Sequence, residues 1–178
     1  EHNSVLRPMY QHREMGCEVD FVPFDSTGYV DPADIERRMR PNTRLVVMNH
    51  GSNVIGTVQD VAEVGRICRE HDCLLVVDAI QGLGAIEFPI AVADVVVAGG
   101  QKWLRSGWGS GLLALSPRSI EMLHPTLAGW WGVEEAFDWE EPPPHSARSD
   151  AERFQVGSPP LFGAMALGAA LEIIEAEG

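Results

Sequence analysis

The sequence predicts an α/β fold in which strands and helices alternate along the chain and the sheet is mainly parallel. Three apolar runs of strand length lie at Arg44–Asn49, Leu74–Asp78 and Ala93–Ala98, and segments with helical spacing separate them. Near-continuous apolar strands are typical of a parallel sheet that is covered on both faces. Each pair of parallel strands then needs a right-handed crossover that passes over one face of the sheet.

Composition and charge narrow the class of protein. The chain has 178 residues, of which 45% are hydrophobic, which is enough for one sizeable core. The net charge of −13 argues against a nucleic-acid binder, and no apolar stretch is long enough to span a bilayer. The odd set of Cys17, Cys68 and Cys73 has no C-x-x-C spacing, so we expect no zinc site and a reducing, cytoplasmic location. The start of the chain does not resemble a signal peptide.

Five segments carry helix signals. Asp31 and Asp60 are N-cap residues, and Pro32 and Pro117 stand at first helical positions. The expected helices are Ser4–Met15, which ends at Gly16, Pro32 to about Met39, Asp60 to about His71, a short one from Ser116–Pro117, and the Ala-rich Gly163–Glu175.

Two further strands and one long excursion complete the expected organisation. Glu18–Phe24 alternates between apolar and polar residues, so we expect a strand with one buried face, placed near an edge by Pro23. Gly111–Leu115 is another expected strand. His124–His145 has no clear period, and a long surface excursion of this kind is often functional or faces a partner.

Polar side chains follow all three parallel strands. Lys102 comes after Gly99-Gly100, Asp78 ends its own run, and Asn49, His50 and Asn53 follow the third. The carboxyl ends of parallel strands share one edge of the sheet, and open α/β sheets bind their ligands there. Each residue by itself has a plain alternative, a solvated lysine or a turn carboxylate, but their convergence predicts a site.

The chemistry of Lys102 and Asp78 matches one cofactor. A lysine in a partly dry crevice has a lowered pKa and can form a Schiff base, while a carboxylate can pair with a protonated pyridine nitrogen. These are the recurring protein contributions to pyridoxal 5'-phosphate (PLP) chemistry. The pair therefore predicts PLP as the cofactor and no metal.

The chain resembles the class V family of PLP enzymes, which includes cysteine desulfurases, selenocysteine lyases and the isopenicillin N epimerase group. The resemblance covers essentially the whole chain, and its motifs come in the order of the family and at nearly its spacing. Those motifs are Glu1–Pro8, Asn49–Thr57, Val76–Gly82, Gly100–Trp103 and Arg153–Pro159.

The resemblance implies a role for each matching residue. Lys102 would form the Schiff base with PLP, and Asp78 would pair with its pyridine nitrogen. Gln81 and Asn53 would hydrogen-bond the phenolic oxygen of the ring, although both amides could instead satisfy turns. His2 would stack on the ring and shuttle protons, although a histidine so near a chain end is often solvated.

Two further residues would bind the phosphate. Gln101 stands where the family often has a phosphate-contacting histidine. Ser158 matches a hydroxyl residue that reaches the cofactor of the neighbouring subunit, which implies a homodimer with a two-fold interface.

The chain also departs from the family pattern. Gly99–Lys102 replaces the frequent Ser-Gly-His-Lys, Arg105–Trp108 replaces a Gly-Pro, and Gln155 replaces a glutamate. The resemblance further implies that residues 1–178 are the central part of the PLP-binding large domain, a three-layer domain of fold type I. An N-terminal segment and a C-terminal small domain, with the arginine for the substrate carboxylate and any catalytic cysteine, would be absent.

Two classes of function follow. The first is a PLP-dependent enzyme acting on an amino acid, for which the resemblance favours cysteine desulfurase or selenocysteine lyase chemistry over an aminotransferase or an epimerase. The second is an α/β domain without PLP, either a nucleotide-binding enzyme or a cofactor-free interaction domain. Neither G-x-G-x-x-G nor G-x-x-x-x-G-K-[ST] occurs in the sequence, which disfavours a nucleotide site.

Overall fold

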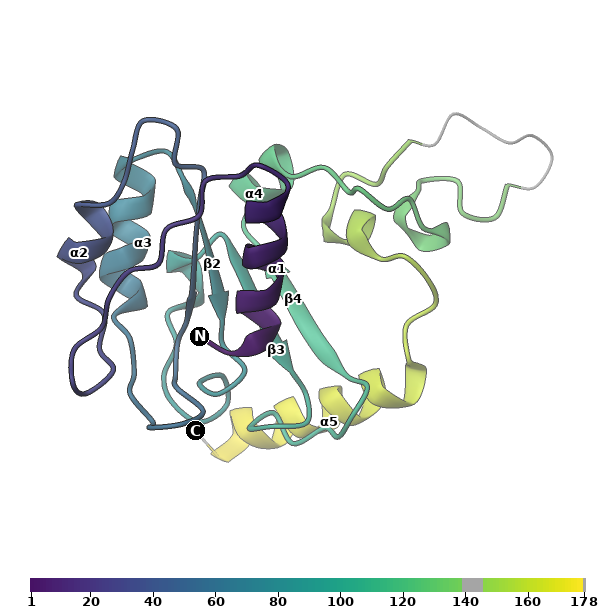
Figure 1. Ribbon diagram of the computed structural model, residues 1–178. Coiled ribbons are helices and arrows are strands. Elements are labelled where there is room, and N and C mark those ends of the chain that lie inside the picture. Colours follow the sequence, from purple (N-terminus) through teal and green to yellow (C-terminus); the bar gives the residue numbers. More distant parts are fainter. Residues whose placement is uncertain (139–145, 178) are drawn as a thin grey trace.

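A four-stranded sheet forms the centre of the computed structural model, which describes residues 1–138 and 146–177 (Figure 1). The strands lie in the order β1-β2-β3-β4. The first three pair in parallel, as the sequence predicts, and the last pairs antiparallel with β3. The strands are β1 (Leu45–Asn49), β2 (Leu74–Asp78), β3 (Val95–Gly99) and β4 (Gly111–Leu115).

The predicted helices are present, with small differences in their bounds. The side chains of Asp31 and Asp60 cap helices as expected, accepting hydrogen bonds from backbone N–H groups in the first turn. The second helix ends at Glu36, about one turn before the predicted Met39. The helices are α1 (Asn3–Glu14), α2 (Pro32–Glu36), α3 (Val61–Glu70), α4 (Pro117–Met122) and α5 (Leu161–Glu177), with short 3-10 turns at Ile90–Val92, Trp130–Gly132 and Ala151–Phe154.

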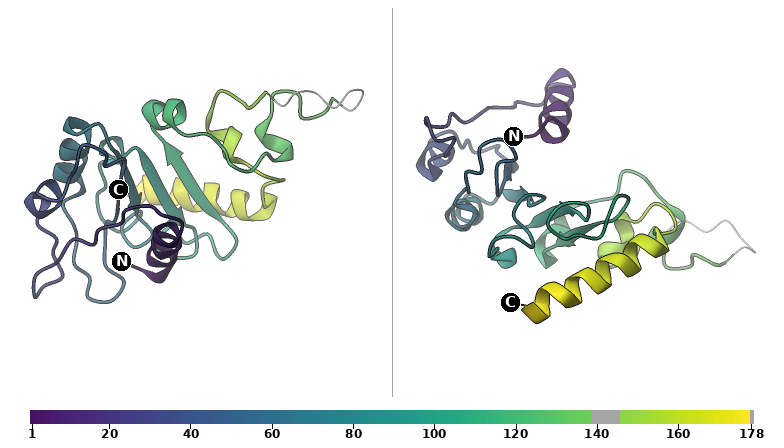
Figure 2. Two further views of the ribbon diagram at one scale, coloured as in Figure 1. Left: turned by 45° about the horizontal axis from the view of Figure 1, so that its top comes forward. Right: turned by 90° about the horizontal axis from the view of Figure 1, so that it is seen from below.

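The hydrophobic core lies between α3 and the sheet. Val64 of α3 packs with Leu75, Val77 and Val96 of the sheet, and all four are almost fully buried. Cys68 belongs to the same core, and burial raises the pKa of its thiol, so it is an inert core residue. Helices α1 and α5 lie on opposite sides of the sheet in the right-hand view of Figure 2, which agrees with the predicted layers.

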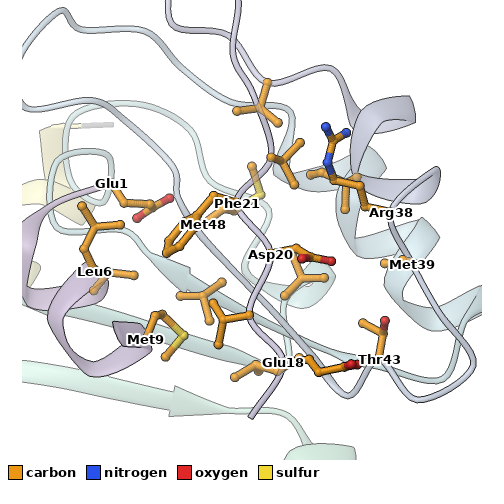
Figure 3. Close-up of a pocket in the computed structure, with 18 of the residues that line it drawn as sticks. Glu1, Leu6, Met9, Glu18, Asp20, Phe21, Arg38, Met39, Thr43 and Met48 are labelled. Carbon is orange, nitrogen blue, oxygen red and sulfur yellow. The ribbon is translucent and has the colours of Figure 1, made fainter. Parts of the chain in front are cut away.

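The prediction of a strand at Glu18–Phe24 is wrong. The segment has no strand hydrogen bonds, although Arg40 forms ion pairs with both Glu18 and Asp20 at one end of it. A cavity of about 840 Å³ separates the segment from the outer edge of β1, and α1 closes one side of it (Figure 3). A strand needs a partner within hydrogen-bond distance, and alternation in the sequence does not supply one.

The long excursion is irregular, as predicted, over the part that the structure describes. Its residues 139–145 lie outside the described residues. The described part packs on the chain near Val156, whose carbonyl accepts a 3.0 Å hydrogen bond from the Trp130 N–H. Gly129 lies so close to the backbone of Val156 that a side chain would not fit.

Candidate active site

The carboxyl ends of β1, β2 and β3 meet at one edge of the sheet, because the three strands are parallel. Two backbone hydrogen bonds extend the ladder past the strand ends. The His50 N–H donates to the Asp78 carbonyl, and the Ala79 N–H donates to the Val97 carbonyl, both at 2.9 Å. The loops that carry the predicted site residues therefore start side by side.

Lys102 lies in the turn Gly100–Leu104 that follows β3. It is the only lysine among the 178 residues, the other twelve cationic side chains being arginine. Leu104 is 1% exposed and anchors the turn in the protein, but Lys102 itself is exposed. The described residues therefore do not form the dry crevice that the sequence predicts around its amine.

Asp78 and Gln81 lie on the next strand end and its loop. Asp78 is half-buried, and its Oδ1 accepts a 3.1 Å hydrogen bond from the Ile80 N–H, which holds the carboxylate against its own turn. Gln81 is also half-buried and packs against Gly51, whose missing side chain would lie 3.6 Å from the Gln81 Cβ. The loops after β1 and β2 are thus in contact.

His2 reaches the same edge through its neighbour in the sequence. Glu1 accepts a 2.7 Å hydrogen bond from the backbone N–H of Asn49, the last residue of β1. Desolvation of the Glu1 carboxylate raises its pKa, and the negative charge of Asp78 adds to this, which places the two carboxylates near one another. His2 caps α1, with its Nδ1 accepting from the Ser4 N–H at 3.2 Å.

The His50 side chain points into the protein and not toward the carboxyl-end edge of the sheet, contrary to the expectation for the polar group at the end of β1. Its side chain is buried, at 3% exposure, and its ring packs on Phe88 with 4.9 Å between the ring centroids. Burial lowers its pKa, so the imidazole is neutral near pH 7. Its Nδ1 has no hydrogen-bond partner among the described residues and faces Gly82, where any side chain would collide with it. In the sequence, this contact is marked only by the glycine at position 82, because a residue without a side chain is needed beside the His50 ring.

The remaining predicted residues are less closely tied to the edge. Asn53 is exposed in the loop after β1, which the bridge between Gly51 and Val58 closes. The Gln101 side chain folds back over Gly99.

Ser158 is exposed and lies on a separate segment, where its Oγ accepts a 3.2 Å hydrogen bond from the Trp131 Nε1. The structure therefore brings Lys102, Asp78, Gln81 and His2 to one edge. It leaves the phosphate-binding roles of Gln101 and Ser158 as predictions.

No group of three potential metal ligands occurs within residues 1–138 and 146–177. In the same residues, no helix has both the length and the apolar character that crossing a bilayer requires.

The chain belongs to the class V aminotransferase family, whose model matches residues 1–178. A probable cysteine desulfurase from Methanothermobacter thermautotrophicus is 34% identical over 184 residues, covering 100% of this chain and 44% of that protein. The chain thus spans less than half the length of the curated relatives that it matches.

Solved structures agree on the fold. The apo structure of a cysteine desulfurase from Thermococcus onnurineus NA1 superimposes with a TM-score of 0.86 at 28% identity, over 99% of this chain and 44% of that one. The fold is also shared with a C-DES variant that has glycine covalently linked to PLP, at a TM-score of 0.85 and 24% identity, over 100% of this chain and 48% of that one.

Proposed function

We propose that the protein is a PLP-dependent enzyme that acts on an amino acid, with chemistry like that of a cysteine desulfurase or selenocysteine lyase. The observation that carries the proposal is the placement of the only lysine of the sequence after β3, one strand away from Asp78. An amine is the group that bonds to the PLP aldehyde, and no other side-chain amine exists in this chain. The relatives named cysteine desulfurase favour that reaction within the family.

The residues at the edge fit PLP by their chemistry. Asp78 Oδ1 is already held by the Ile80 N–H, and no hydrogen bond engages Oδ2 within the described residues, so that oxygen is available to a pyridinium N–H. Gln81, three residues further along the same loop, carries an amide that can donate to the phenolic oxygen. PLP, when bound, supplies an electron sink for a carbanion at the amino-acid α-carbon.

Each residue at the edge would have its own role. Asp78 keeps the pyridine nitrogen protonated, because a carboxylate partner stabilises the positive charge. Lys102 would attach the cofactor, and its amine would hold or move the proton at the substrate α-carbon. His2, at the start of α1, would cover the ring, and Gln101 would bind the phosphate. In a homodimer, Ser158 would bind the phosphate of the cofactor held by the neighbouring subunit. A reducing, cytoplasmic location accords with the three free cysteines of the described residues.

The test is covalent trapping on the full-length protein. PLP is added, the complex is reduced with borohydride, and the peptides are mapped by mass spectrometry. We expect the pyridoxyl label on Lys102 and a visible absorbance band before reduction. A label on any other residue, or none, would overturn the proposal and favour a cofactor-free interaction domain.

The products distinguish the candidate reactions from one another. With a thiol added as the two-electron reductant, cysteine converted to alanine and sulfide identifies a desulfurase. A keto acid that keeps its sulfur, formed when an amino-group acceptor is added, identifies an aminotransferase. Loss of optical activity without a new product identifies an epimerase. We expect alanine.

A further inference from the structure

We infer that the hydroxyl groups of Ser106 and Ser110, called the serine pair below, are positioning groups for Lys102. The inference rests on the proposed function, since it concerns how the reactive amine is presented. The loop between β3 and β4 starts at Gly99 and ends at Gly111, which face one another in the antiparallel register. Lys102 lies within this loop and is otherwise exposed.

Backbone hydrogen bonds tie the serine pair to the start of the loop. The Gly100 N–H donates to the Ser110 carbonyl at 2.8 Å, and the Ser106 N–H donates to the Gly100 carbonyl at 2.9 Å. Gly100 is therefore held on both of its backbone polar groups, two residues before Lys102. Because the chain continues directly from Gly100 to Lys102, this contact limits where the lysine backbone lies.

The two hydroxyls also hydrogen-bond to each other next to Gly100. Ser110 Oγ donates to the Gly107 carbonyl at 3.0 Å, and a hydroxyl has only one proton to donate. Ser106 Oγ, at 2.6 Å, is therefore the donor to Ser110 Oγ. The result is a chain from Ser106 to Ser110 to the Gly107 carbonyl, which closes the loop across its middle.

Gly100 is buried beneath the serine pair, and the contact requires a glycine. A Cβ built at this position would collide with both hydroxyl oxygens. Its φ angle is not in the left-handed region, so backbone conformation does not forbid alanine, and the nearest obstacles to a Cβ are the side chains of the serine pair. Gly100 thus allows the two hydroxyls to lie directly against the backbone.

The other side of the turn is anchored separately. Leu104 is almost fully buried, and a Cβ at Gly84 would lie 2.9 Å from the Trp103 carbonyl, so the turn docks closely on the loop that follows Gln81. Lys102 is therefore held between two fixed points, each two residues away. Its backbone is held on both sides while its side chain is exposed, which is an arrangement suited to a reactive amine that must meet an aldehyde carbon.

The experiment compares capture of PLP by serine variants of the full-length protein. The amine condenses with the PLP aldehyde with loss of one water, and borohydride stops the reaction at timed intervals so that label on Lys102 can be counted. We expect S106A/S110A to slow this capture on the order of tenfold, since a misplaced reacting group loses rate steeply. S106T keeps a hydroxyl donor and should recover much of the wild-type rate.

A second measurement needs no cofactor. Trypsin cleaves after Lys102 and Arg105, and cutting requires the loop to open. In the cofactor-free protein we expect S106A/S110A to be cut several-fold faster at these two bonds while its unfolding midpoint stays close to that of the wild type. S26A, which removes an exposed hydroxyl from the Asp25–Tyr29 turn, is the matched control and should change neither rate.

Three outcomes decide the matter. Wild-type rates of capture and cleavage in S106A/S110A would overturn the inference and leave the proposed function standing. Failure of the wild type to capture PLP at Lys102 would overturn the proposed function, and the inference with it. If the double variant does not fold, G100A and S106A are measured in its place, and slowed capture in both supports the serine pair while unchanged capture overturns it.

Discussion

The backbone N–H of His50 donates a 2.9 Å hydrogen bond to the carbonyl oxygen of Asp78, across the carboxyl ends of β1 and β2. The carboxylate proposed to hold the pyridine nitrogen is thus positioned by a residue whose own side chain is buried against Phe88 and Gly82. The geometry of the exposed edge therefore depends on packing directly beneath it.

Substitution of Lys102 should abolish covalent capture of PLP and all turnover. Because the side chain is exposed and its turn is anchored by Leu104, we expect Lys102→Ala to change the free energy of unfolding by no more than about 0.5 kcal/mol. Lys102→Arg is the control, since it keeps the positive charge but cannot bond to the aldehyde. Borohydride labelling with peptide mapping checks the first effect, and thermal unfolding checks the second. Residual turnover in either variant would contradict the assigned role.

Asp78→Asn should lower the catalytic rate and leave stability unchanged, whereas Asp94→Asn should lower stability and leave the catalytic rate unchanged. In Asp78→Asn, the amide oxygen of the new side chain can still accept from the Ile80 N–H, so stability should hold. The rate should nevertheless fall on the order of a hundredfold or more, because the negative charge is lost. Steady-state kinetics on the cofactor-loaded protein measures this.

Asp94 is the control because it is buried just before β3, where it accepts from the Leu75 N–H and pairs with Arg118. Asp94 is buried but the Arg118 side chain is 29% exposed, so weakening this pair should cost about 1–3 kcal/mol of folding free energy. The folded fraction of Asp94→Asn should keep its catalytic rate. A large loss of rate in this variant with unchanged stability would contradict the distinction.

Acid should destabilise the protein through His50. Burial lowers the pKa of this imidazole in the folded state, so the unfolded chain binds the proton more readily. The stability that the neutral ring contributes is therefore complete above the unfolded value of about 6.5 and is lost as the pH falls below it, by at most about 1.4 kcal/mol per pH unit.

His50→Phe tests the assignment of this pH dependence. It keeps a ring against Phe88 and loses no hydrogen bond at Nδ1 among the described residues. Urea unfolding between pH 7.5 and 5 should show a shallower loss of stability than in the wild type. Equal slopes in the two proteins would show that another group is responsible.

Gly82→Ala should destabilise the fold, whereas Gly168→Ala should stabilise it. A Cβ at Gly82 would collide with the His50 ring, and overpacking of this kind costs about 1–3 kcal/mol. Gly168 lies in α5 with nothing within 4 Å of the added carbon, so alanine should contribute roughly 0.5–1 kcal/mol through helix propensity. Chemical denaturation measures both, and similar values for the two glycines would contradict the packing seen around His50.

Much of the architecture could be predicted from local sequence signals. The apolar runs ending at Asn49, Asp78 and Ala98 indicate a parallel sheet, because such strands must be buried on both faces. The caps at Asp31, Asp60 and Ser116 mark helix starts, because their side-chain oxygens satisfy N–H groups that the helix leaves open.

The prediction at Glu18–Phe24 was wrong for a reason outside the segment. Alternation shows that a segment can present one apolar face, but strand structure also requires a neighbour at hydrogen-bond distance. Here a cavity lies between the segment and β1, and the segment has no strand partner. No local pattern reports the distance between two segments.

The sequence by itself determined that a lysine, a carboxylate and an amide follow neighbouring strands, because parallel strands carry their ends to a common edge. Only the tertiary structure decided which polar groups stay at that edge. His50 turns inward because Gly82 leaves room for its ring, and Lys102 stays exposed because Gly100 and Leu104 hold its turn at the surface. These outcomes depend on contacts between residues far apart in the sequence or on the closure of a whole loop, which the order of residues along one strand does not specify.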